Sequence, residues 1–138
     1  MRACYIAGPM RGRDDYHFPL FFRAEYWLER AGWAVFNPAR VDVLREGWPS
    51  ESALLGTHLT HRNGLSTEVV GVNSDFRPED VRKYAKRDCR ILIEYLAAER
   101  GDALVVLDGW QGSTGALAEY HVARWVQLPR LTLQEALA

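Results

Sequence analysis

Short continuous hydrophobic runs are spaced along the chain between longer segments with a helical pattern. Residues 3–7, 33–36 and 103–107 form three such runs, each followed by Gly-Pro, Asn-Pro or Asp-Gly. Runs of this length between turn residues predict buried strands, and unbroken apolar strands are typical of a parallel sheet covered on both faces. Residues 130–133 predict a last short strand.

Three segments carry apolar residues at helical spacing. They are residues 18–31, the segment that begins at Pro78, and residues 114–126. Pro19 suits a first helical turn and Gly32 suits a helix stop, so the first helix has a signal at each end. The pattern therefore predicts strand, helix, strand, insertion, helix, strand, helix and strand, in that order.

This alternation predicts an α/β protein, a flavodoxin-like or Rossmann-like three-layer sandwich with a mostly parallel sheet. The 138 residues suit a single domain, 1–138, with a long insertion at about residues 39–77 after the second strand. That polar segment has no sustained period and is too long for a plain connection. We expect a lid over a ligand site or an arm from a neighbouring subunit; an oligomerisation arm away from the site is the alternative.

The composition of the chain limits the kinds of binding partner and the cellular compartment that we expect for the protein. The chain is 48% hydrophobic and 25% charged, which is typical of a soluble globular protein, and its formal net charge is −1. That charge gives no reason to expect a nucleic acid polymer, and no apolar run has membrane-spanning length. The N-terminus resembles no signal peptide, so we expect a cytoplasmic protein in which Cys4 and Cys89 are buried free thiols.

Two glycine-containing loops follow predicted strands at what should be the same sheet edge. Residues 8–13 include two arginines, and residues 109–115 lead into a helix start. Unpaired N–H groups and the positive end of the dipole make a helix N-terminus suitable for a phosphate or carboxylate. In the alternative, the first residues of that helix are simply a cap and the glycines are turn residues. The candidate ligand-binding residues are Gly8, Arg11, Ser113, Thr114 and Gly115.

Two carboxylates stand out near this edge. Asp88 falls on the apolar stripe of its helix, where a carboxylate needs a partner or a cavity; an ion pair with Arg87 or Arg90 is the structural alternative. Glu119 lies about one turn into the third helix, where it could simply favour the helix dipole. A carboxylate pair is also the minimum set for glycosidic chemistry, in which one group attacks or stabilises the anomeric carbon and the other manages a proton.

Other catalytic arrangements have weaker support. His58 and His61 have no Cys or carboxylate cluster at metal-ligand spacing, so we interpret them as loop histidines. The chain has no P-loop sequence and no legible Ser-His-Asp set. We therefore expect neither a metal nor another cofactor.

Three segments resemble the motifs of the nucleoside 2-deoxyribosyltransferase superfamily, which includes 2'-deoxynucleoside 5'-monophosphate N-glycosidases. They are residues 5–12 (Tyr-Ile-Ala-Gly-Pro-Met-Arg-Gly), Asp88, and residues 113–119 (Ser-Thr-Gly-Ala-Leu-Ala-Glu). The resemblance implies that Glu119 is the nucleophile, that Asp88 positions the sugar or protonates the base, and that Tyr5 orients the nucleophile. The whole chain is similar to an uncharacterised, often phage-encoded branch, and the superfamily implies a homo-oligomer.

Departures from these motifs bear on the reaction. Transferases usually have an aspartate at the position of Ser113, whereas the monophosphate glycosidases have a serine there, in a phosphate site whose arginine corresponds to Arg11. Pro9 departs the other way, because the glycosidases tend to have a serine at that position. We expect hydrolysis of the N-glycosidic bond of a nucleoside 5'-monophosphate. The alternatives are a deoxyribosyltransferase that exchanges bases on a nucleoside and a non-catalytic nucleotide-sensing module.

Overall fold

The computed structural model describes residues 1–10, 17–40 and 78–138. Arg11 and most of the predicted insertion, residues 41–77, lie outside the described residues. Residues 38–40, where the insertion begins, are helical. The predictions made for His58, His61 and the rest of the insertion beyond residue 40 therefore lie outside the described residues.

A parallel sheet forms the centre of the fold. Within the described residues it has four strands, which are β1 (Ala3–Ala7), β2 (Ala34–Phe36), β3 (Ala103–Val106) and β4 (Arg130–Thr132). Their order is β2-β1-β3-β4, and each neighbouring pair is parallel. The predicted α/β class with a parallel sheet is confirmed.

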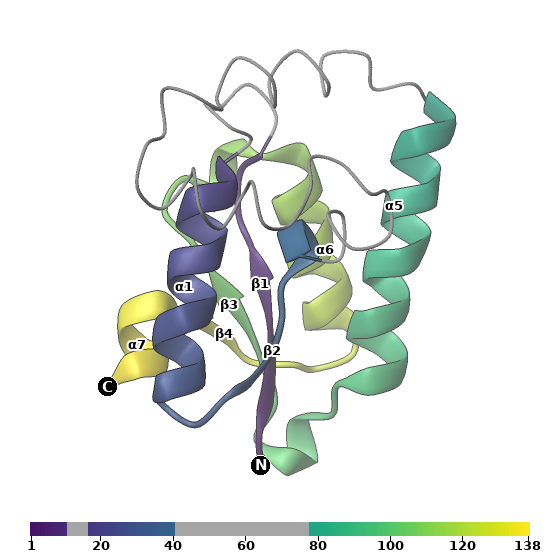
Figure 1. The fold of residues 1–138 in the computed structure, drawn as a ribbon. Coiled ribbons are helices and arrows are strands. Elements are labelled where there is room, and N and C mark those ends of the chain that lie inside the picture. The colour runs from purple at the N-terminus through teal and green to yellow at the C-terminus, as the bar shows by residue number, and fades with distance from the viewer. Residues whose placement is uncertain (11–16, 41–77) are drawn as a thin grey trace.

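Helices cover both faces of this sheet (Figure 1). Helices α1 (Phe18–Arg30) and α7 (Leu133–Leu137) lie on one face, and α5 (Pro78–Arg90) and α6 (Thr114–Trp125) lie on the other. Side chains alternate along β1, so Cys4 and Ile6 pack in the α1 core while Tyr5 and Ala7 pack in the α6 core. The result is the three-layer, Rossmann-like arrangement that the hydrophobic pattern predicts.

The strand order places a crevice at the carboxyl ends of β1 and β3. From β1 the chain passes through α1 to β2 on one side, while β3 pairs with β1 on the other side. Open α/β sheets bind ligands where the strand order reverses in this way. The loop after β1 and the N-terminus of α6 both lie at this edge.

Most predicted boundaries agree with the structure to within one residue. Helix α1 ends at Arg30, and Gly32 follows with a φ of 97°, a conformation that glycine adopts without steric cost. The predicted loop at 108–112 contains a 3₁₀ turn, Trp110–Gly112. Strand β2 begins one residue later than predicted, at Ala34.

The helix that begins at Pro78 departs from the prediction at its C-terminal end. The apolar stripe after Pro78 has helical spacing as far as Leu96 and so predicts an α-helix to that residue. The structure instead changes to a π-helix at Ile91–Tyr95, and Leu96 is extended. That part of the prediction is wrong. The π turn buries Ile91 and Leu92, and Leu96 is buried directly after it, so apolar spacing alone does not distinguish a π-helix from a continued α-helix.

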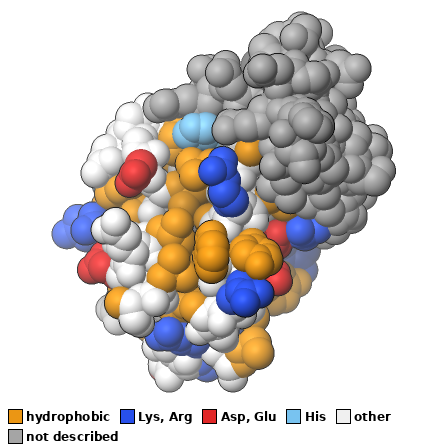
Figure 2. Space-filling model, turned by 60° about the vertical axis from the view of Figure 1, so that its left-hand side comes forward, with side chains coloured by type: hydrophobic (Ala, Val, Ile, Leu, Met, Phe, Trp, Pro, Cys, Tyr) orange, Lys and Arg blue, Asp and Glu red, His pale blue; other side chains and the backbone are white. Residues whose placement is uncertain are grey.

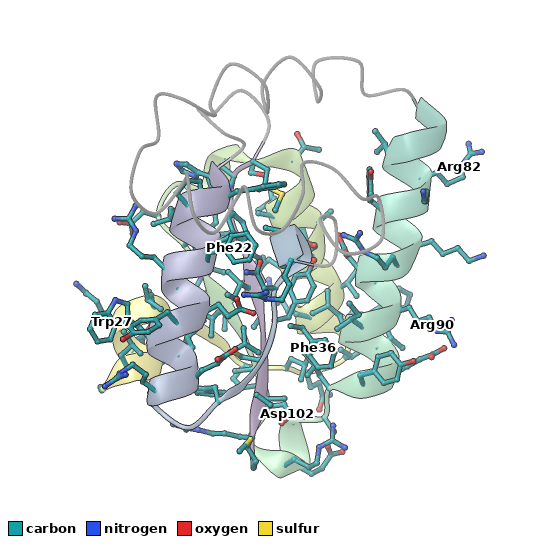
Figure 3. The ribbon with its side chains drawn as sticks, viewed as in Figure 1. Phe22, Trp27, Phe36, Arg82, Arg90 and Asp102 are labelled. Atoms are coloured by element: carbon teal, nitrogen blue, oxygen red, sulfur yellow. The ribbon has the colours of Figure 1, made fainter. Side chains whose placement is uncertain are left out.

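A buried carboxylate secures the opposite, amino-terminal edge of the sheet (Figure 3). Asp102 is fully buried and accepts hydrogen bonds from the N–H groups of Ala3, at 2.8 Å, and Ala97, at 2.9 Å. Arg100 adds an ion pair at 2.8 Å. Burial alone would raise the pKa of Asp102, but these three partners outweigh it and lower the pKa.

The outer surface of α1 combines apolar and basic side chains. Tyr26 and Trp27 remain 52% and 51% exposed, and Arg30 lies over the Tyr26 ring at 5.3 Å. Figure 2 shows orange and blue side chains together on the side of the molecule that carries α1. No helix in the described part of the chain is long and apolar enough to cross a membrane.

Candidate active site

A pocket of about 520 Å³ opens at the carboxyl edge of the sheet. Its walls come from the loop after β1, from α1, from α5 and from the first turns of α6. Small-molecule sites usually have volumes of roughly 300–1,000 Å³, so the pocket has room for a ligand of that class. Of the predicted site residues, Gly8, Asp88, Ser113, Thr114, Gly115 and Glu119 line it.

Three polar side chains from three different elements meet beside this pocket: Asp88 and Glu119 line it, and the buried Tyr5 contacts Glu119. Tyr5 projects from the middle of β1 and its hydroxyl donates a hydrogen bond to Oε2 of Glu119 on α6. Asp88 on α5 lies close enough to both side chains to affect their protonation and to be affected by them. The structure thus brings together the three residues to which the sequence resemblance gives catalytic roles.

Asp88 also has a cationic partner. Nε of Arg87 donates a hydrogen bond to Oδ1 of Asp88 at 2.8 Å, and the side chains of the two residues are 11% and 13% exposed. Arg90 instead pairs with Glu94 on the exposed side of the segment. The ion pair expected as a structural alternative for Asp88 is therefore present with Arg87, and it coexists with the contact to Glu119.

The two carboxylates affect each other's protonation. Burial raises the pKa of Glu119 well above its usual value, and the neighbouring charge of Asp88 raises it further. Burial also raises the pKa of Asp88, and the ion pair with Arg87 reduces that rise without cancelling it. When two carboxylates are this close, one proton belongs to the pair. We assign it to Glu119, because Asp88 has the direct ion pair.

Tyr5 is held as a neutral hydrogen-bond donor. Its ring is completely buried, and burial raises its pKa, as do the charges of Glu119 and Asp88. A tyrosine with a raised pKa keeps its proton throughout the physiological range. Its hydroxyl therefore donates to Glu119, an interaction that favours the ionised form of that carboxyl group.

The start of α6 combines a cap with a pocket wall. Ser113 is the N-cap residue, and its Oγ accepts a hydrogen bond from the N–H of Ala116 at 3.2 Å. Thr114 and Gly115 follow at the exposed first turn and line the pocket. The capping alternative is correct for Ser113, and the same turn also faces the pocket.

Close packing explains the glycine at position 8. A Cβ atom at Gly8 would lie 3.0 Å from Cβ of Leu107 and 3.3 Å from the Phe21 ring. Contacts this short would force the neighbouring side chains to move, so this glycine lets the loop after β1 pack closely against the end of β3.

The structure also adds pocket residues that the sequence pattern did not identify. Phe18 and Phe21 on α1 line the pocket, as do Tyr84 and Cys89 on α5. Both phenylalanines fit the buried stripe of an amphipathic helix, and a stripe does not distinguish core from pocket. In the sequence, only the position of Cys89 next to Asp88 indicated that this thiol could lie at the pocket. Neither Cys4 nor Cys89 forms a disulfide in the described part of the chain.

No group of three or more His, Cys, Asp or Glu side chains suited to a metal ion occurs within residues 1–10, 17–40 and 78–138.

Residues 2–61 and 70–131 match a family model described as a domain of unknown function, DUF4406. The match covers most of the chain, which therefore belongs to the DUF4406 family. No curated protein and no solved structure matches the chain.

Proposed function

We propose that this protein hydrolyses the N-glycosidic bond of a nucleoside 5'-monophosphate, with Glu119 as the nucleophile. The observation that carries the proposal is the cluster of Tyr5, Asp88 and Glu119, of which the two carboxylates line a pocket of about 520 Å³. The resemblance of the three sequence motifs to the nucleoside 2-deoxyribosyltransferase superfamily supports the same chemistry. We therefore propose that this DUF4406 domain is related to that superfamily.

The pair's single proton suits the first chemical step. In our proposal it passes from Glu119 through Asp88 to a nitrogen of the leaving base. The bond between C1' and the base nitrogen breaks, and its electron pair stays on the protonated base. The carboxylate oxygen of Glu119, now ionised and held by the Tyr5 hydroxyl, forms the new bond to C1'.

Water completes the reaction. Asp88, again ionised, takes a proton from a water molecule as the water oxygen bonds to C1'. The bond between C1' and Glu119 breaks, its electron pair returns to the carboxylate, and the sugar 5'-phosphate leaves with a new hydroxyl group. Transfer of that proton from Asp88 to the freed carboxylate of Glu119 restores the starting state of the pair.

The pocket offers different surroundings for the different parts of such a substrate. Phe18, Phe21 and Tyr84 supply aromatic surface suited to a base or to the apolar face of a sugar. The first turn of α6, at Thr114 and Gly115, supplies backbone N–H groups and a positive dipole end suited to a 5'-phosphate. Arg11 lies outside the described residues, and its contribution to phosphate binding stays a prediction from the sequence.

A substrate panel tests the proposal. The protein is incubated with nucleoside 5'-monophosphates and the matching nucleosides, with and without an added free base, and the products are separated by chromatography. Hydrolysis predicts release of free base from the monophosphates without an added base. Products formed only with an added base would replace the proposal with a transferase, and binding without products would replace it with a nucleotide sensor.

A further inference from the structure

One basic side chain of α5 behaves differently from its neighbours. Arg82, Lys86 and Arg90 are exposed, and Figure 3 shows Arg82 and Arg90 projecting away from the sheet. The side chain of Arg87 is only 11% exposed and lines the pocket. A guanidinium is rarely buried unless its charge is paired, so its position requires an explanation.

The contacts of Arg87 direct its charge towards the carboxylate pair. Its Nε lies 2.8 Å from Oδ1 of Asp88, although consecutive side chains on a helix do not normally face each other. Its guanidinium lies 5.1 Å from the centre of the Tyr84 ring, another pocket residue. The guanidinium of Arg87 therefore contacts both an aromatic ring and a carboxylate of its own helix.

The titratable groups around Asp88 come from each element packed there. Tyr5 lies on β1, Arg87 and Cys89 lie on α5, and Glu119 lies on α6. Tyr5 and Cys89 are neutral when protonated, whereas Arg87 is charged at every accessible pH. Its positive charge acts to lower the pKa of Asp88, and also those of Glu119 and Tyr5.

Resting on the proposed function, we propose that Arg87 is a positioning residue that keeps Asp88 ionised and so leaves the proton of the carboxylate pair on Glu119. An ionised Asp88 can receive that proton and pass it to the leaving base. A carboxylic acid beside a fixed cation is also a stronger proton donor than an isolated one. Arg87 thereby sets the lowest pH at which the site is active.

Three variants separate this role from a structural one. Arg87→Gln removes the charge and keeps much of the side-chain length, whereas Arg87→Lys keeps the charge. Arg90→Gln is the matched control, because it removes an exposed cation and an ion pair from the same segment. Side-chain carboxyl ¹³C resonances, followed by NMR as the pH is changed, report the titration of Asp88 without requiring turnover.

The proposal predicts that Arg87→Gln moves the titration of Asp88 upwards by about one pH unit or more, as expected when an adjacent cation is lost. Arg87→Lys, which keeps the charge, should hold the midpoint close to the wild-type value, and Arg90→Gln should leave it within about 0.3 unit of wild type. The low-pH limb of kcat/KM should move with the NMR midpoint. An unchanged Asp88 midpoint in folded Arg87→Gln would overturn the proposal, as would an equal shift in Arg90→Gln.

If Arg87→Gln does not fold, Arg87→Lys and the NMR titration midpoints of Asp88 and Glu119 in the wild-type protein still test the proposal. Asp88 must then titrate well below Glu119 in the wild type, and the reverse order overturns the proposal. Failure of the proposed function is separate, because absence of base release from every nucleotide would leave the NMR result on Arg87 intact.

Discussion

Replacing Asp102 with alanine tests how the amino-terminal edge of the sheet is held together. The change removes the acceptor of two backbone N–H groups, on Ala3 at 2.8 Å and on Ala97 at 2.9 Å. Leaving a buried donor without a partner costs roughly 1–3 kcal/mol. Both N–H groups belong to partly buried residues that water can reach in part, so the lower half of the range applies to each.

The ion pair with Arg100 adds little, because that side chain is 57% exposed and solvent screens the interaction. We therefore expect Asp102→Ala to lower the free energy of unfolding by about 2–4 kcal/mol. For a chain of this size the loss corresponds to a Tm decrease of roughly 6–15 °C. Urea unfolding followed by circular dichroism measures the difference.

The dependence on pH provides an independent check. The pKa of Asp102 is lowered in the folded protein, so its carboxylate contributes stability above the unfolded pKa of about 3.9 and loses it as the pH falls through the folded pKa. The difference between wild type and Asp102→Ala should therefore shrink below about pH 4. Glu99→Ala, an exposed carboxylate in the neighbouring 3₁₀ turn, is the control. A loss below about 0.5 kcal/mol at pH 7, within the range of ordinary surface substitutions, would refute the reasoning.

Two further predictions concern the carboxylate pair. Because the pKa of Glu119 is raised in the folded protein, wild-type stability should fall as the pH rises above about 4.3, the unfolded value. Glu119→Gln should relieve part of that loss, so thermal unfolding should show a larger gain in Tm for the variant at pH 8 than at pH 5. A larger gain in Tm at pH 5 would contradict the assignment of the proton to Glu119. Tyr5→Phe removes the hydrogen bond to Glu119, which is worth roughly 1.5–3 kcal/mol if the acceptor is charged, so base release should slow by about 10- to 150-fold. The exposed tyrosine variant Tyr26→Phe should leave the rate unchanged, and an equal effect of both variants would show that the Tyr5 hydroxyl has no specific role.

The layer arrangement was predictable because each strand and helix carries its own local signal. The run at residues 103–107 is unbroken and ends at Asp-Gly, and Pro19 and Gly32 mark the two ends of α1. The π-helix at Ile91–Tyr95 was not predictable, because its buried residues also fit a continued α-helix. Turn geometry of that kind depends on packing against the sheet, which a local pattern does not describe.

The candidate site could be predicted only in part from the sequence, because some of its features depend on contacts between distant elements. Asp88 attracts attention because a carboxylate interrupts an apolar stripe, and Glu119 because it follows a Ser-Thr-Gly helix start. Tyr5 sits in an ordinary hydrophobic strand, and only the family resemblance marked it. The buried position of Arg87 depends on side-chain contacts that the sequence does not specify. An ion pair of Asp88 with Arg87 could therefore be predicted only as an alternative to one with Arg90.

Release of base from nucleoside 5'-monophosphates by wild type and Glu119→Gln tests the central claim most directly. Gln keeps the size of the side chain but cannot act as an ionised nucleophile, so the rate should fall by roughly three orders of magnitude or more while folding is retained. Glu135→Gln, an exposed carboxylate on α7, is the matched control and should keep the wild-type rate. Free base released by wild type and by Glu135→Gln, with almost none from folded Glu119→Gln, is the predicted result. Turnover by Glu119→Gln within a few-fold of wild type would contradict the account.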